Sequence, residues 1–331
     1  MRKISLTGIK PTGSLHVGNY FGAIRPALKL AEDYDARYFI ADYHGLNQVK
    51  DPRELEGNIR EVAAGWLASG LDPEKVIFYR QSSVPETFEL TTMLMAFTSK
   101  GLMNRAHAYK AAVQANTEKG EDPDAGINMG LFTYPVLMAA DILLFNPDVV
   151  PVGKDQVQHV EMAQDIAQAI NFNYKKELLK VPQPLVQEAT ALVPGLDGRK
   201  MSKSYDNTIP LFLPEKQLRK LTMKIITNSQ TVDEPKDPDA CQVFTLYKLF
   251  AGKEEQQALA ARYREGGMGW GEAKEALFQA MNRELTPLRA RYDDIMSDLG
   301  GLNRILAQGA QKARDIAAET VGRLRKAVGI D

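Results

Sequence analysis

Short apolar segments alternate with longer amphipathic segments over the first half of the chain. Residues 37–41, 76–79 and 149–152 are short and mainly apolar, as in buried strands, and residues 4–7 read as a short strand that enters a Gly/Pro loop. The segments between them carry apolar residues at helical spacing, as in residues 52–68. Strands that alternate with helices predict an α/β fold with a doubly wound parallel sheet. The other predicted helices span residues 17–31, most of 86–114, 130–144 and 155–170.

The pattern changes after residue 204. Residues 212–331 show helical periodicity and almost no strand signal, so we predict a domain boundary near 206–212. The chain is therefore predicted to contain an α/β domain over residues 1–206, with a helical insertion at about 84–128, and a helical domain over 207–331. Residues 116–126 are predicted to form a flexible loop, and residues 172–198 are predicted to be rich in loops.

Composition limits the possible functions without choosing one. The longest apolar runs, around Asp141, are too short to span a bilayer, and the N-terminus has no apolar core typical of a secretory signal. Cys241 is the single cysteine, which excludes an internal disulfide or a thiolate metal cluster and favours a reducing cytoplasm. The net charge of −1 does not favour a nonspecific nucleic-acid binder.

A glycine-rich turn connects the first predicted strand to the first helix. Residues 7–19 read TGIKPTGSLHVGN, and the helix that follows points its free N–H groups towards this turn. His16 and Asn19 are three residues apart, so they share one helix face and can both donate hydrogen bonds to phosphate oxygens. The alternative interpretation is a glycine-rich turn with one capping histidine.

A second segment suited to phosphate lies far along the chain. Residues 200–204 read KMSKS and follow the turn-forming sequence PGLDG at 194–198. Two lysines beside two hydroxyls indicate a mobile cationic loop that can contact a polyphosphate.

One helix carries a carboxylate inside an apolar run. Tyr134, Met138 and Asp141 are spaced i, i+4 and i+7, so they line one stripe of the helix. The stripe offers a phenol, a flexible apolar wall and an acceptor, which together suit an indole ring with its N–H donor. The alternative is that a backbone N–H or a nearby lysine satisfies Asp141 within the protein.

Further polar residues follow predicted strands, at the sheet edge where ligands bind in such folds. The sequence GKDQ at 153–156 places Asp155 where it can bind ribose hydroxyls or cap the next helix, and Gln156 where it can bind an ammonium or carboxylate group. His44 follows another strand at the same edge. His159 is predicted to lie on the helix surface or behind the binding residues.

These motifs together resemble a known family. The turn at 7–19 and the loop at 200–204 resemble the HIGH and KMSKS signatures of class I aminoacyl-tRNA synthetases, in the expected order. Residues 134–144, reading YPVLMAADILL, look like the tryptophanyl branch, because tyrosyl members typically carry glutamine at the position of Met138. Residues 263–274 resemble the anticodon-binding segment of the same branch.

The resemblance implies a Rossmann-like catalytic domain that activates L-tryptophan with ATP and Mg²⁺ and transfers it to tRNA(Trp). It also implies a cytoplasmic homodimer that pairs through the Met-rich helices at 86–114. The residues implied in catalysis are Lys200, Ser202, Lys203, His16, Asn19 and Lys110. Those implied in binding ATP are Lys10, Pro11, Thr12, Gly18, Asn19, Gly153, Lys154, Asp155, Ala191, Leu192, Met201 and Ser204. Those implied in binding the amino acid are Leu6, His44, Tyr134, Met138, Asp141 and Gln156.

The chain departs from the family pattern at four positions near these motifs, Lys10, Tyr43, Gly45 and Lys154. Lys10 could add a cationic contact beside the α-phosphate or change the amino-acid side of the site. The departures leave open an auxiliary synthetase or a non-charging paralogue that binds ATP or tryptophan. A tyrosyl-type enzyme is the alternative within the same class, and Met138 disfavours it. Another nucleotidyl transferase with the same loop chemistry is a further alternative, although it would not need the helical C-terminal domain.

Overall fold

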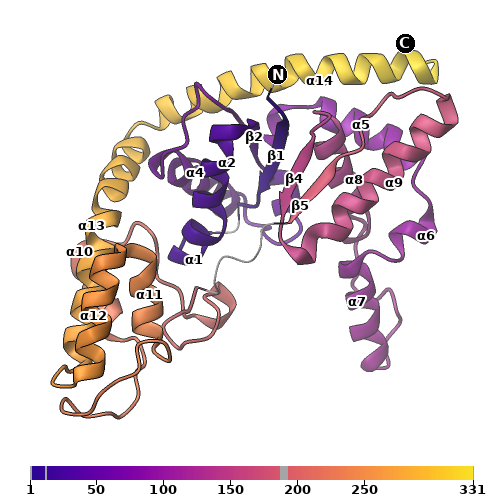
Figure 1. The fold of residues 1–331 in the computed structure, drawn as a ribbon. Coiled ribbons are helices and arrows are strands. Elements are labelled where there is room, and N and C mark those ends of the chain that lie inside the picture. The colour runs from indigo at the N-terminus through magenta and orange to yellow at the C-terminus, as the bar shows by residue number, and fades with distance from the viewer. Residues whose placement is uncertain (1, 12, 187–192, 331) are drawn as a thin grey trace.

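The computed structural model, which describes residues 2–11, 13–186 and 193–330, contains a five-stranded parallel sheet (Figure 1). The strands lie in the order β3-β2-β1-β4-β5, and this confirms the doubly wound α/β fold. The chain crosses from one side of β1 to the other between β3 and β4, and ligands bind at such switch points. The strands are β1 (Ile4–Ile9), β2 (Asp35–Ile40), β3 (Ile77–Arg80), β4 (Val149–Val152) and β5 (Gln183–Val186).

The central strands are buried on both faces, which explains their continuous apolar runs. In β2, Tyr38 packs in one hydrophobic cluster with the helices that follow β1 and β2, while Phe39 packs in a second cluster on the opposite face. Strand β2 pairs with β1 from Ile4↔Asp35 to Ile9↔Ile40, which brings the carboxyl ends of these strands to one edge.

The described residues contain fourteen α-helices, and the predicted helices are all found with adjusted ends. Helices α10 to α13 lie apart from the sheet (Figure 1). Asp51 caps α4 by accepting hydrogen bonds from the N–H groups of Arg53 and Glu54, and Pro52 fixes its first turn. The α-helices are α1 (Val17–Asn19), α2 (Arg25–Asp33), α3 (Asp42–Gly45), α4 (Pro52–Ala68), α5 (Glu86–Met95), α6 (Lys100–Met103), α7 (His107–Glu118), α8 (Met129–Leu143), α9 (Val157–Tyr174), α10 (Glu215–Met223), α11 (Gln242–Phe250), α12 (Lys253–Glu265), α13 (Trp270–Ser297) and α14 (Leu299–Val328).

One strand was missed, and two local predictions were wrong. The loop-rich segment 172–198 contains the edge strand β5, whose proline and half-exposed side chains hid it from the pattern. The first helix is not uniformly α-helical, since Tyr20–Ile24 forms a π-helical turn between α1 and α2. The loop predicted from residue 116 begins later, because α7 continues to Glu118. Among the described residues, no helix combines the length and apolar character needed to cross a membrane.

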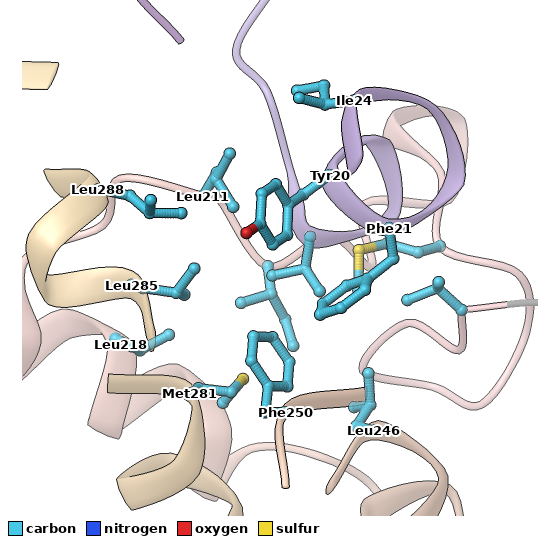
Figure 2. Packing of buried hydrophobic residues seen from close by; sticks show 14 of the residues in the cluster. Tyr20, Phe21, Ile24, Leu211, Leu218, Leu246, Phe250, Met281, Leu285 and Leu288 are labelled. Carbon is cyan, nitrogen blue, oxygen red and sulfur yellow. The ribbon is translucent and has the colours of Figure 1, made fainter. Parts of the chain in front are cut away.

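A large hydrophobic cluster joins the first helical segment to the C-terminal helices (Figure 2). The Phe21 ring meets the Phe250 ring of α11 edge-on, with centroids 4.8 Å apart. The Tyr20 hydroxyl donates to Glu284 of α13 over 3.0 Å. The C-terminal helices therefore support the helix that begins at the glycine-rich turn.

The last helix returns to the sheet (Figure 1) and packs against the outer strand β3. Gly309 of α14 has no side chain to separate the two backbones, and a Cβ atom there would lie 1.9 Å from the carbonyl oxygen of Phe78. Gly322 of the same helix has open space around it. Strand β3 ends beside the candidate site, so this contact fixes one wall of the site.

We expect Gly309→Ala to lower the free energy of unfolding by about 3 kcal/mol, because α14 has to move away from β3 to admit the methyl group. Gly322→Ala is the matched control, and we expect it to raise stability by about 0.5–1 kcal/mol through helix propensity. Urea unfolding of both variants measures the difference. Equal effects of the two substitutions would contradict the close approach of α14 to β3.

Candidate active site

The two motifs that were predicted to bind phosphate line one cavity of about 640 Å³. The glycine-rich turn after β1 forms one wall, and the loop at residues 200–204 forms another. Three lysines, Lys10, Lys200 and Lys203, line the cavity, and none of its described lining residues is acidic. A concave site with this charge attracts polyanions.

Backbone contacts hold the two walls together. The Val17 N–H donates to the carbonyl of Ile209 over 2.9 Å, and the Leu211 N–H donates to the carbonyl of Leu15 over 2.9 Å. The Gly18 N–H donates to the Met201 sulfur over 3.2 Å. The sequence places these segments almost two hundred residues apart, and the fold brings them into direct contact.

His16 caps the helix that follows the turn. Its Nδ1 accepts a hydrogen bond from the Asn19 N–H over 3.3 Å, and the Asn19 side-chain oxygen accepts from the His16 N–H over 3.1 Å. The neutral ring therefore carries its proton on Nε2, which makes it a donor. Burial, followed by the charge of Lys203, lowers the pKa of His16 to about 4. The capping alternative and the phosphate-donor prediction are thus compatible, because one nitrogen serves each role.

The lowered pKa of His16 predicts a dependence of stability on pH. Between pH 6.5 and about 4 the unfolded chain binds a proton that the folded chain excludes, so stability falls as the pH falls through this window. We expect this loss to be on the order of 1 kcal/mol by pH 5, allowing for solvent screening. His16→Asn keeps a capping acceptor but does not titrate, so its free energy of unfolding should fall less between pH 7 and pH 5. Urea unfolding at several pH values gives the free energy of unfolding of both proteins. An equal loss of this free energy between pH 7 and pH 5 in the two proteins would contradict the lowered pKa of His16.

The loop at 200–204 presents its polar groups around a short 3-10 turn, Lys203–Tyr205. Ser202 caps this turn by accepting from the Ser204 N–H over 3.3 Å. The Lys203 ammonium reaches the turn after β1, since a Cβ atom at Gly13 would lie 3.2 Å from its Nζ. Partial burial lowers the pKa of Lys203, and the charge of Glu61 opposes this shift.

Asn207 organises this loop, and the sequence interpretation missed it. Its side-chain oxygen accepts from the Ser202 N–H over 2.8 Å, and its amide group donates to Asp197 over 2.6 Å and to the Lys200 carbonyl over 3.2 Å. Gly195 leaves room for it, because a Cβ atom there would lie 2.3 Å from the Asn207 side chain. An asparagine three residues after a cationic motif was a usable signal, since asparagine often organises turns.

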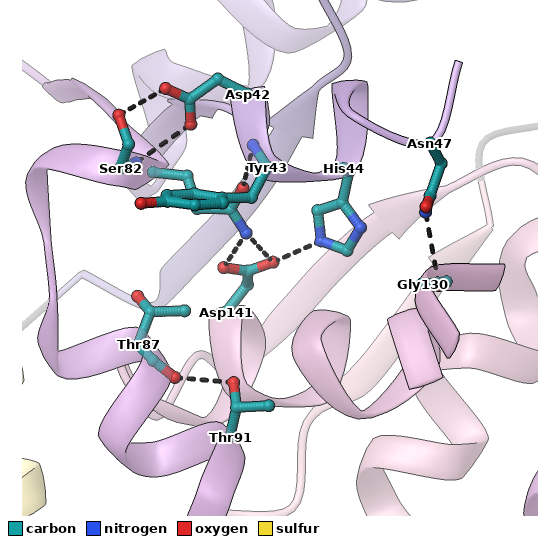
Figure 3. A network of polar contacts seen from close by, with 10 residues as sticks. Asp42, Tyr43, His44, Asn47, Ser82, Thr87, Thr91, Gly130 and Asp141 are labelled. Atoms are coloured by element: carbon teal, nitrogen blue, oxygen red, sulfur yellow. Dashed lines mark hydrogen bonds and ion pairs between the residues drawn. The ribbon is translucent and has the colours of Figure 1, made fainter. Parts of the chain in front are cut away.

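The Asp141 carboxylate of α8 is buried and is already hydrogen-bonded within the protein (Figure 3). His44 Nε2 lies 2.8 Å from Asp141 Oδ2, and the Gln81 amide donates to both carboxylate oxygens over 2.8 and 2.9 Å. The partners of Asp141 are therefore two side chains that follow β2 and β3. From the sequence, a backbone N–H or a lysine had instead been considered as the partner. Burial raises the pKa of Asp141, and the bonds from His44 and Gln81 oppose this shift.

The rest of the predicted stripe of α8 lies beside this network. The Tyr134 hydroxyl is 2.7 Å from His159 Nε2, and its ring meets the His44 ring edge-on, with centroids 6.4 Å apart. Met138 is half-buried and packs against the hydrophobic cluster that contains Phe39 and Leu6. The side chain of Leu6, on β1, is 1% exposed. His159 is buried, so the helix-surface prediction for it was wrong, and its contact places it behind Tyr134.

The turn after β4 carries the residues predicted to bind ribose and the amino-acid head group. Residues 154–156 form a 3-10 turn, and the N-cap position of α9 is occupied by Gln156. The prediction that Asp155 caps this helix was therefore wrong. Asp155 Oδ2 instead accepts from the Gln156 amide over 2.8 Å. Gly153 begins the turn, and a Cβ atom there would lie 2.8 Å from Asp155 Oδ1.

Some predicted residues lie apart from the cavity. Lys110 is on the exposed helix α7, which projects from the body of the molecule (Figure 1), and it is not among the residues that line the cavity. Pro11 is buried and packs against Gly45. A Cβ atom added at Gly45 would lie 3.2 Å from the proline ring. The departure at Gly45 therefore allows close packing of α3 against the turn. Thr12, Ala191 and Leu192 lie outside the described residues.

Comparisons with known proteins agree with this geometry. The family model for class I tRNA synthetases (W and Y) matches residues 2–286. A tryptophan–tRNA ligase of Pseudomonas aeruginosa is 53% identical over 329 residues, covering 98% of this chain and 73% of that protein. A tryptophan–tRNA ligase of Neisseria meningitidis is 51% identical and covers 99% of this chain and 98% of its own.

A solved structure extends the likeness to three dimensions. The tryptophanyl-tRNA synthetase of Campylobacter jejuni, in complex with ADP and tryptophan, superposes with a TM-score of 0.91 at 43% identity, covering 98% of this chain and 99% of its own. The match of the family model over most of the chain, the identity to its members and the joined motifs lead to one conclusion: the chain belongs to the class I tRNA synthetases of the tryptophan and tyrosine group.

Proposed function

We propose that this protein is a tryptophan–tRNA ligase that activates L-tryptophan with ATP and transfers it to tRNA(Trp). The observation that carries the proposal is that the glycine-rich turn and the loop at 200–204 line one cavity together. The buried Asp141 network lies at the carboxyl ends of the neighbouring strands. The names of relatives that are about half identical over nearly the whole chain support the same activity.

In the first step, the tryptophan carboxylate attacks the α-phosphorus of ATP, and the bond to pyrophosphate breaks. The nucleophile is already ionised, so the protein needs no general base and acts by positioning and by stabilising charge. Lys200 and Lys203 supply charge to the phosphates, and His16 Nε2 supplies a neutral donor. Ser202, Ser204 and Asn19 can add hydrogen bonds. The ADP bound to the Campylobacter jejuni protein is consistent with this use of the cavity.

Mg²⁺ would enter this site on the ATP phosphates. Among the described residues, no group of three or more histidine, cysteine or acidic side chains could hold a metal ion, and the cavity lining there is cationic or neutral. The donor set therefore fits a cation held mainly by phosphate oxygens, which is the usual arrangement for Mg²⁺ with nucleotides. Its chemistry would be to neutralise the charge of the leaving pyrophosphate.

The amino acid would lie along the stripe of α8. Asp141 would accept the indole N–H, and Met138 would pack on the ring. Tyr134 and Gln156 would bind the ammonium or carboxylate group, and His44 would line the pocket. A pocket with a buried acceptor rejects phenylalanine, because that ring would leave the acceptor without its donor. Leu6 would complete the apolar wall, and Gly153, Lys154 and Asp155 would contact the nucleotide.

The remaining assignments concern the protein as a whole. Residues 1–206 would form the catalytic domain with the insertion at about 84–128, and residues 207–331 would bind the anticodon region of the tRNA. We propose a homodimer that pairs through residues 86–114, where Met95 is 46% exposed although large apolar side chains are usually covered. A role in translation implies a cytoplasmic location.

Pyrophosphate exchange with each of the twenty amino acids, followed by charging of total tRNA, tests this proposal. We expect ATP-dependent exchange with tryptophan alone, and charging of one tRNA that accepts tryptophan. Exchange with tyrosine would instead favour a tyrosyl-type enzyme. No exchange with any amino acid, in a protein that still binds ATP, would indicate a non-charging paralogue and contradict the proposal.

A further inference from the structure

Gln81 lies outside every predicted motif, yet it makes the most hydrogen bonds to the buried carboxylate. It begins the short 3-10 turn that follows β3 and is 1% exposed. Its amide nitrogen lies 2.8 and 2.9 Å from the two oxygens of Asp141. Its amide oxygen accepts from the Tyr43 N–H over 3.1 Å. Gln81 thus connects the carboxyl ends of β2 and β3 to α8.

The orientation of the Gln81 amide is fixed by its neighbours. The Tyr43 N–H can only donate, so the atom that faces it must be the amide oxygen of Gln81. The amide nitrogen, which only donates, consequently faces Asp141. The adjoining turn is also fixed, because Asp42 accepts hydrogen bonds from the backbone and hydroxyl of Ser82 over 3.0 and 2.5 Å. Figure 3 shows Asp42, Tyr43 and Asp141 in this network.

The hydrogen bonds leave one side of Asp141 available. A carboxylate oxygen accepts about two hydrogen bonds in its plane. Among the contacts of the described residues, Oδ2 accepts from His44 and from Gln81, whereas Oδ1 accepts only from Gln81. One acceptor position therefore remains, on Oδ1. Without Gln81 the carboxylate could rotate about its bond to the chain, and it would lose a donor that stabilises its ionised form in a buried place.

We propose that Gln81 is a positioning residue for amino-acid selectivity, which holds Asp141 as an ionised acceptor with Oδ1 directed at the N–H of the substrate ring. This inference rests on the proposed function, because it assumes that the ring is indole. It differs from the assignment of Asp141 in that Gln81 does not touch the substrate. Its effect should therefore depend on whether the substrate carries the N–H.

Gln81→Met tests the proposal, since methionine has nearly the same shape but donates no hydrogen bond. Two substrates are compared in pyrophosphate exchange: L-tryptophan, and β-(3-benzothienyl)-L-alanine, in which sulfur replaces the ring N–H. For Gln81→Met we expect kcat/KM for tryptophan to fall about 10- to 100-fold, mainly through KM. For the benzothienyl substrate we expect a change of less than about threefold.

Thr91→Val is the matched control, because it removes a buried hydroxyl of α5 that bonds only within its own helix among the described contacts, to the Thr87 carbonyl over 2.7 Å. It should leave the ratio of the two substrates unchanged. An equal loss for both substrates in Gln81→Met, or no loss for either, would overturn the positioning role. A failure of the proposed function is distinct, since the unaltered protein would then not activate tryptophan at all.

A second variant keeps the test valid if Gln81→Met does not fold. Gln81→Glu preserves the acceptor for Tyr43 but places a second carboxyl group against Asp141. The other titratable groups near this network, among the described residues, include Asp42, Tyr43 and His44 of α3, Tyr79 of β3, Tyr134 of α8 and His159 of α9. Two adjacent carboxylates share one proton, and the introduced carboxyl group, when protonated, can donate to Asp141 as the amide does. We expect kcat/KM of this variant for tryptophan, relative to the unaltered protein, to rise at least threefold from pH 8 to pH 6. A ratio independent of pH would contradict the need for a donor at this position.

Discussion

Lys203→Ala should slow formation of the tryptophanyl adenylate by about 10²- to 10³-fold, while the Kd for tryptophan changes by less than about twofold. The reason is that additional negative charge builds up on the α-phosphate and the leaving pyrophosphate in the transition state. Lys203 reaches the glycine-rich turn, which is predicted to bind these phosphates, and it does not reach the Asp141 network. Single-turnover measurement of adenylate formation at saturating ATP gives the chemical rate. Equilibrium titration with tryptophan gives the Kd.

Lys216→Ala is the control, since Lys216 is an exposed lysine of α10 outside the cavity. It removes the same charge from the protein, so a long-range effect of net charge would appear in both variants. An unchanged chemical rate in Lys203→Ala would contradict the role assigned to the loop. Equal losses in Lys203→Ala and Lys216→Ala would point to net charge in place of a specific contact.

Asp141→Ala should reduce the preference for tryptophan over phenylalanine, expressed as the ratio of kcat/KM values, on the order of 100-fold or more. The substitution removes the acceptor of the indole N–H, whereas the phenylalanine ring has no N–H to lose. It also leaves buried donors of His44 and Gln81 without their partner, which should cost about 1–3 kcal/mol of stability for each donor. Pyrophosphate exchange with tryptophan, tyrosine and phenylalanine measures the ratio, and urea unfolding measures the stability.

Asp165→Ala provides the comparison, because Asp165 is an exposed acid of the neighbouring helix α9. It should change neither the ratio nor the stability by a large amount. If Asp141→Ala kept the preference for tryptophan over both other aromatic amino acids, the acceptor role of Asp141 would be wrong. A loss of activity by the same factor for all three substrates would indicate damage to the fold.

The sequence predicted the parts of the fold that have strong local signals. The apolar run at 37–41 could only be buried on both faces, and Asp51 with Pro52 marks the start of α4 at the predicted residue. Strand β5 carries a weak signal, because edge strands tolerate proline and exposed residues. The π-helical turn at Tyr20–Ile24 has no local signature, since it arises where the helix packs against α11 and α13.

The site was predictable where one motif carries its own chemistry. The turn at 7–19 and the loop at 200–204 were identified from residue types alone, and the structure joins them in one cavity. The partners of Asp141 were not predictable, because Gln81 is 60 residues away and its bonds depend on how the ends of β2 and β3 lie beside α8. Asn207 was missed although asparagine often organises turns, because its partners Asp197, Lys200 and Ser202 become apparent only once the loop is folded.

The central claim is that the turn after β1 and the loop at 200–204 bind one ATP molecule beside a pocket for indole. A crystal structure with a non-hydrolysable ATP analogue and L-tryptophan tests it most directly. We predict one nucleotide whose phosphates lie within about 3.5 Å of both Lys203 Nζ and the donors of the turn. We also predict an indole nitrogen within about 3 Å of Asp141 Oδ1. A nucleotide that contacts only one of the two segments, or an indole ring bound away from Asp141, would contradict the account.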